Sequence, residues 1–123
     1  MEYRYIIPGV PPSNNKFIGR KNIWEYRKVK EEWEQLIFYK CCRDLPPKPI
    51  CIAEIIIEYY FPDKRRRDPD NYGGKMLLDG LRKAGVIEDD SFDNIPDIHY
   101  VKHYSKDMPR TVITVREITE RVD

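Results

Sequence analysis

The residues best suited to chemistry lie between positions 64 and 93, where dense positive and negative runs are neighbours. Asp68 and Asp70 directly follow a run of four cations, and Asp90 belongs to an acidic cluster beyond a helix-like segment. The four cations are Lys64, Arg65, Arg66 and Arg67. Such cations bind phosphate, and carboxylates are the side chains that Mg²⁺ prefers. The stretch therefore suits a site where cations hold a phosphate backbone and metal-activated water cuts it.

Each of these acids also has an ordinary structural interpretation. Asp70 or Asn71 is a good N-cap for the following helix, and residues 88–93 suit a solvated loop. Lys75 is placed either to reach a scissile phosphate or to pair with Asp79, four residues later. A calcium loop is disfavoured, because its DxDxDG spacing is absent.

A second basic segment covers residues 16–30 and interleaves cations with aromatic rings. Its cations are Lys16, Arg20, Lys21, Arg27, Lys28 and Lys30, and its aromatic residues are Phe17, Trp24 and Tyr26. This mixture suits neutralisation of a nucleic-acid backbone and stacking on unpaired bases. A solvated helix face with its aromatic side chains turned inward explains the same pattern.

Apolar periodicity predicts four strands and two helices. Alternation indicates strands over residues 2–7, 50–61, 98–104 and 111–118, with the second the strongest. A four-residue repeat indicates a helix over 23–43, and a second apolar stripe indicates a helix over 71–84 that ends at Gly85. Gly73 and Gly74 suggest a distorted helix start or a close approach, for example by a phosphate. The order β-α-β-α-β-β predicts an α+β fold: one small mixed sheet covered on one face.

Composition limits the class of protein further. The 123 residues suit a single domain spanning 1–123, and 35% charged residues suit a heavily charged surface. A net charge of only +1 means that any nucleic-acid binding must use a local patch. No apolar run is long enough to span a bilayer and no signal-peptide pattern is present, so we expect a cytoplasmic protein with no membrane partner. The three cysteines lack CxxC spacing and are expected to be reduced thiols.

Three sequence blocks together form a specific pattern. The first is Pro11-Pro12-Ser13-Asn14-Asn15 after the first strand, and the second is RRRDPDN at 65–71. The third runs from LDGL at 78–81 through AGVI at 84–87 to DDS at 89–91. In sequence, order and separation the three blocks resemble the RusA-like Holliday-junction resolvases over nearly the whole chain.

The resemblance implies a homodimeric, Mg²⁺-dependent endonuclease that acts on four-way junction DNA in recombination and repair. Asp68, Asp70 and Asp90 match the catalytic, metal-binding acids, and Lys75 matches a functional lysine, although one extra residue lies near Gly74. Two-fold symmetry would supply the two nicks that resolution requires. The residues expected to contact DNA are Lys64, Arg65, Arg66, Arg67, Asn14, Asn15 and Lys16. A non-catalytic DNA-binding protein and a Mg²⁺-dependent hydrolase of small phosphate substrates remain alternatives.

Overall fold

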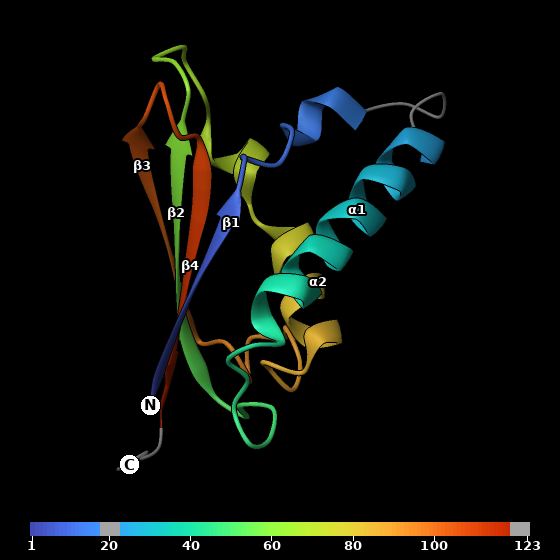
Figure 1. Ribbon diagram of the computed structural model, residues 1–123, viewed down its shortest axis with the longest axis vertical. Helices are drawn as coiled ribbons and strands as arrows, with labels where there is room; N and C mark the ends of the chain where they lie inside the picture. The colour runs from blue at the N-terminus through green and yellow to red at the C-terminus, as the bar shows by residue number, and fades with distance from the viewer. Residues whose placement is uncertain (18–22, 119–123) are drawn as a thin grey trace.

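The computed structural model describes residues 1–17 and 23–118, apart from the side chain of Asn15. Four strands form one mixed sheet in the order β1-β4-β2-β3, and both α-helices lie on the same side of it (Figure 1). The strands are β1 (Glu2–Pro8), β2 (Ala53–Phe61), β3 (Asp97–Tyr104) and β4 (Arg110–Glu117). The helices are α1 (Ile23–Cys41) and α2 (Lys75–Ala84), with 3-10 helices η1 (Asn14–Phe17) and η3 (Pro69–Tyr72). The predicted α+β class and β-α-β-α-β-β order are confirmed.

Strand β2 is central because it pairs on both sides, parallel to β3 and antiparallel to β4. Its alternation places one wholly apolar face under the helices, and the five side chains on that face are all buried. They are Ala53, Ile55, Ile57, Tyr59 and Phe61. The matching faces of β1 and β4 complete the sheet's half of the core.

The opposite face of the sheet carries contacts of histidine and arginine side chains with glutamates. His99 and His103 share this face of β3, and each contacts a glutamate of β2, at 3.4 Å to Glu54 and 2.8 Å to Glu58. Arg116 of β4 lies 2.7 Å from Glu54 as well. The two histidines are therefore partners of strand carboxylates.

Helix α2 is shorter than the sequence predicts. It begins at Lys75 because Gly74 adopts a left-handed conformation (φ 78°) and acts as the N-cap; the N-cap prediction for Asp70 or Asn71 is therefore wrong. A Cβ on Gly74 would lie 2.9 Å from Cδ1 of Ile57, so the glycine also allows close approach to the sheet. The helix ends at Gly85, which is left-handed as predicted.

The two α-helices cross in close contact at Gly80, where an added Cβ would lie 2.6 Å from Cδ1 of Ile37. After α2 the chain returns to the sheet through buried Val86 and Ile87, and Ile87 forms a parallel bridge with Ile50. This return delivers residues 88–95 to the α2 side of the molecule. Within the described ranges, no helix combines the length and apolarity needed to cross a membrane.

Candidate active site

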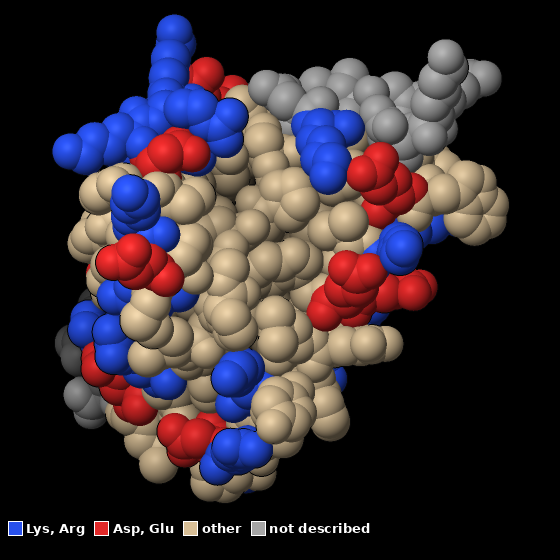
Figure 2. Space-filling model, turned by 45° about the horizontal axis from the view of Figure 1, so that its top comes forward, with Lys and Arg blue, Asp and Glu red and all other residues tan. Residues whose placement is uncertain are grey.

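The cationic run lies in the loop that follows β2, at the top of Figure 1. When that end is turned forward, Lys and Arg side chains gather at the upper left, interleaved with carboxylates and bordered by a neutral surface (Figure 2). Arg65 and Arg66 are strongly exposed, with Arg66 at 89%. A hollow of about 360 Å³ lies beside them, and Asp68 lines it too. The loop therefore presents cations and a carboxylate to one open hollow.

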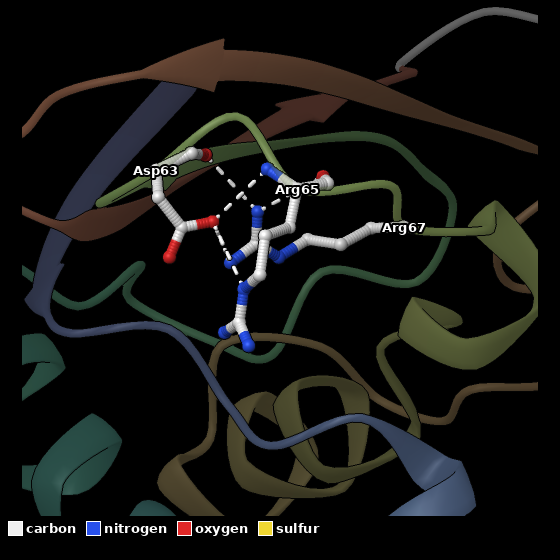
Figure 3. Close-up of polar contacts among 3 residues, drawn as sticks. All are labelled: Asp63, Arg65 and Arg67. Atoms are coloured by element: carbon white, nitrogen blue, oxygen red, sulfur yellow. Dashed lines mark hydrogen bonds and ion pairs between the residues drawn. The ribbon is translucent and has the colours of Figure 1, made fainter.

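Arg67 differs from its neighbours, because its side chain is only 10% exposed. Its guanidinium lies 2.9 Å from the Asp63 carboxylate, donates to the Asp63 carbonyl and covers the Phe61 ring at 4.3 Å. Arg65 contacts the same carboxylate at 3.2 Å (Figure 3). The backbone N–H of Arg65, together with both guanidinium groups, holds the pKa of Asp63 below its usual range. Arg67 thus fixes the shape of the loop that presents Arg65 and Arg66.

The first two predicted catalytic acids lie directly after this loop. Asp68 has the extended conformation (φ −98°, ψ 135°) that a following proline favours, and its carboxylate lies 3.3 Å from Nε of Arg66. Asp70 lies in η3 and is exposed. Both carboxylates are therefore open to a ligand from solvent.

The loop after β1 packs against the same region. Asn14 and Lys75 together line a hollow of about 340 Å³, and Ser13 lines the hollow that contains Asp68. Lys16, which follows Asn14, lies 3.3 Å from Glu25 of α1. The structure thus brings two of the three sequence blocks together. Arg20 and Lys21 fall outside the described residues.

Asp90 lies in a different environment, beside the buried Asp79. Asp79 is 7% exposed at its side chain; it lies 3.2 Å from Lys30 of α1 and 3.8 Å from Lys75. The Asp90 side chain lies close enough to Asp79 to contribute to the lowering of its pKa. Burial alone would raise the pKa of Asp79, but the Lys30 hydrogen bond and the charges of Lys75 and Lys30 outweigh it and lower that pKa.

Among the described residues, no three His, Cys, Asp or Glu side chains converge closely enough to hold a metal ion. Asp68, Asp70 and Asp90 are therefore not a ready-made three-carboxylate cage. Their assignment as metal ligands and that of Lys75 as a functional lysine stay predictions. The same holds for the predicted DNA contacts.

Sequence reasoning missed Lys30 as part of this region. The i,i+4 spacing of Lys75 and Asp79 signalled one ion pair, which the structure contains. Lys30 lies 49 positions before Asp79, and only the close crossing of α1 over Gly80 brings the two together. Nothing in the local spacing of either residue indicates the contact.

An α+β fold that exposes carboxylates and arginines at one end of its sheet has the groups that suit binding and hydrolysis of a phosphodiester. Comparison with known proteins agrees: the family model "Endodeoxyribonuclease RusA" matches residues 8–116. A curated relative, the crossover junction endodeoxyribonuclease RusA of Enterobacteria phage HK97, is 36% identical over 107 residues, which cover 82% of this chain and 85% of the relative. The chain belongs to the endodeoxyribonuclease RusA family. It is an enzyme, a nuclease that cuts DNA.

Proposed function

We propose that this chain is a structure-selective endonuclease that resolves four-way (Holliday) junctions with Mg²⁺, by paired symmetric nicks from a homodimer. The observation that carries the proposal is the single hollow of about 360 Å³ that presents Arg65, Arg66 and Asp68 together. Cations there neutralise a phosphodiester next to a carboxylate that takes a metal. The name of the phage HK97 relative, a crossover junction endodeoxyribonuclease, supports four-way DNA as the substrate.

The chain's own residues divide the work. Arg65 and Arg66 are exposed, and their ion pairs with Asp63 and Asp68 also lie at the surface. Both guanidinium groups can therefore bind the phosphates on either side of the cut. Arg67 stays in its contacts with Asp63 and keeps that loop in place. Lys75 extends from the first turn of α2 next to Asn14, where its ammonium neutralises charge on a phosphate oxygen.

The donor set fits Mg²⁺. Asp68, Asp70 and Asp90 offer hard carboxylate oxygens, and Asp68 and Asp70 are exposed. Mg²⁺ usually binds through one or two protein carboxylates, with waters and substrate phosphate completing its shell, so a preformed cage of three acids is not required. When bound, Mg²⁺ supplies Lewis-acid activation of water and of the phosphodiester.

A two-fold dimer accounts for the number of nicks. One chain carries one copy of the site, whereas resolution needs cuts in two strands of like polarity. A two-fold axis places an identical site on the second strand. Doubling the exposed arginines also gives a chain of net charge +1 a larger basic surface toward DNA.

The substrate test uses three labelled molecules with Mg²⁺: a four-way junction, a linear duplex of the same sequence and a nucleoside triphosphate. Paired symmetric nicks on the junction alone are the expected result. Equal cutting of the duplex would remove structure selectivity. Binding without any cutting would favour a non-catalytic junction binder, and hydrolysis of the nucleotide alone would favour a small-molecule hydrolase.

A further inference from the structure

A second cavity, built from aromatic rings, adjoins the hollow of about 360 Å³ that Arg65, Arg66 and Asp68 line, which we call the arginine hollow. It has a volume of about 120 Å³ and lies between the ends of β2 and β3 and the η3 segment. Its walls include the rings of Tyr59, Phe61, Tyr72 and Tyr100. Tyr72 packs edge-on against Phe61 and Tyr59, with ring centroids 5.1 and 5.7 Å apart. The cavity is thus framed by rings that hold one another in position.

Two of the tyrosines that line the cavity, Tyr59 and Tyr100, already use their hydroxyl groups in hydrogen bonds. The Tyr59 hydroxyl donates to the backbone carbonyl of Tyr72 at 2.9 Å, and the Tyr100 hydroxyl donates to the carbonyl of Gly73. These two tyrosines therefore offer mainly apolar ring surface to an occupant. Tyr100 is 39% exposed, so one wall remains accessible from solvent.

The cavity and the arginine hollow are adjacent, because Arg67, Asp68 and Tyr72 line both. Lys102 adds a cation at the cavity. A nucleotide with its phosphate beside Asp68 and the exposed arginines would therefore have an aromatic cavity immediately next to that phosphate. This neighbourhood matches the two parts of a nucleotide, an anionic phosphate and a flat ring.

We propose that the aromatic cavity holds one unstacked nucleobase next to the phosphate that is cut. Its volume of about 120 Å³ is below the roughly 150 Å³ of an apolar cavity that holds one benzene molecule, so it accommodates part of one ring system, with the rest at the accessible Tyr100 wall. An unstacked base costs least where pairing is already interrupted, as where strands exchange in a junction. The inference rests on the proposed junction cleavage and extends it by assigning a base-binding site.

The test is a cycle that removes the base and the wall separately and together. A junction carries a stable abasic analogue in place of the nucleotide on one side, then the other, of the scissile phosphate. Single-turnover cleavage with Mg²⁺ and junction affinity in gel shifts are measured for the wild type and Tyr100→Ala. If the base stacks in the cavity, the cleavage rate or junction affinity of the wild type should fall roughly 5- to 150-fold at one of the two abasic positions. Tyr100→Ala should reduce the same quantity by a similar factor on the intact junction. Removing the base should then reduce it little further in this variant.

Two further variants separate this result from damage to the fold. Tyr100→Leu keeps apolar volume but removes the ring, so it should lose abasic sensitivity even if Tyr100→Ala unfolds. Tyr104 belongs to the same strand, is 48% exposed and does not line the cavity. Tyr104→Ala should therefore have the same abasic sensitivity as the wild type.

The base site would be overturned if the losses caused by the abasic nucleotide and by Tyr100→Ala multiply when both are present. It would also be overturned if the wild type is insensitive to removal of the base on both sides of the scissile phosphate. If the wild type cuts the intact junction but the effects of the abasic nucleotide and of Tyr100→Ala are independent, the base site is rejected and the proposed function stands. Absence of wild-type cleavage on the intact junction rejects the proposed function, and the affinity cycle then decides the pocket by the same coupling.

Discussion

The contact between Lys30 and Asp79 joins α1 to α2, and replacing Lys30 with methionine should destabilise the fold. Methionine keeps most of the apolar stem of lysine and removes the ammonium. Asp79 would remain in place with its side chain 7% exposed, and Lys75 would be its remaining cation, at 3.8 Å. Lys75 is largely exposed and its attraction is weakened by solvent.

The expected loss is about 2–3 kcal/mol in the free energy of unfolding at neutral pH. A hydrogen bond to a charged group contributes about 1.5–3 kcal/mol, and breaking a fully buried ion pair costs about 3–5 kcal/mol. Lys30 is 28% exposed, so this pair is only partly shielded from water and the lower part of the combined range applies.

The pH dependence follows from the two pKa shifts. The pKa of Asp79 is lowered in the folded protein, so its contribution is complete above the unfolded value of about 3.9 and is lost as pH falls through the folded value. The pKa of Lys30 is raised, chiefly by its hydrogen bond to Asp79. Its contribution is therefore complete below about pH 10.4 and is lost as pH rises through the folded value.

Urea unfolding without divalent metal, from acid to alkaline pH, measures this. Lys28→Met, a change at an exposed position of α1, is the matched control and should stay within about 0.5 kcal/mol of wild type. The reasoning is refuted if Lys30→Met matches that control at neutral pH. A deficit that persists undiminished well below the pKa of Asp79 would refute its electrostatic origin.

Three further changes give independent checks. Gly74→Ala should destabilise by about 2–3 kcal/mol, since a left-handed non-glycine residue costs about 1–2 kcal/mol and the new Cβ would lie 2.9 Å from Ile57; thermal unfolding equal to wild type would contradict this. Arg66→Ala should weaken binding to all junction sequences and reduce the slope of log affinity against log salt by about 1, and an unchanged slope would remove this arginine from the interface. Burial raises the pKa of the Cys41 thiol to about 12, so a thiol reagent at pH 8 should modify two of the three cysteines in the native state, not three.

Local patterns predicted most of the fold. The alternation of β2 gave its buried face, because every second side chain of a strand points to the same side. Gly85 marked the end of α2, because a glycine readily adopts the left-handed conformation found there. The predicted start of α2 was wrong, since the apolar stripe that predicts the helix does not indicate that Gly74 is left-handed and that the helix begins after it.

The candidate site was predictable only in part, because local patterns do not indicate contacts between segments that are distant in the sequence. The neighbourhood of Arg66 and Asp68 follows from their adjacency in sequence, and the structure has them in contact at 3.3 Å. The internal role of Arg67 depends on the Phe61 ring and the turn at Asp63, whose geometry no local pattern specifies. The proximity of Asp90 to Asp79 requires the whole return path of the chain after α2.

The central claim, cleavage by carboxylate-bound metal, is tested most directly by comparing Asp90→Asn with wild type on one labelled four-way junction. Cleavage with Mg²⁺ and gel-shift binding without it are measured on the same preparation, with Asp93→Asn, in the same acidic loop, as the control. We expect Asp90→Asn to bind the junction and fail to cut it, while Asp93→Asn does both. Normal cleavage by Asp90→Asn would contradict the account.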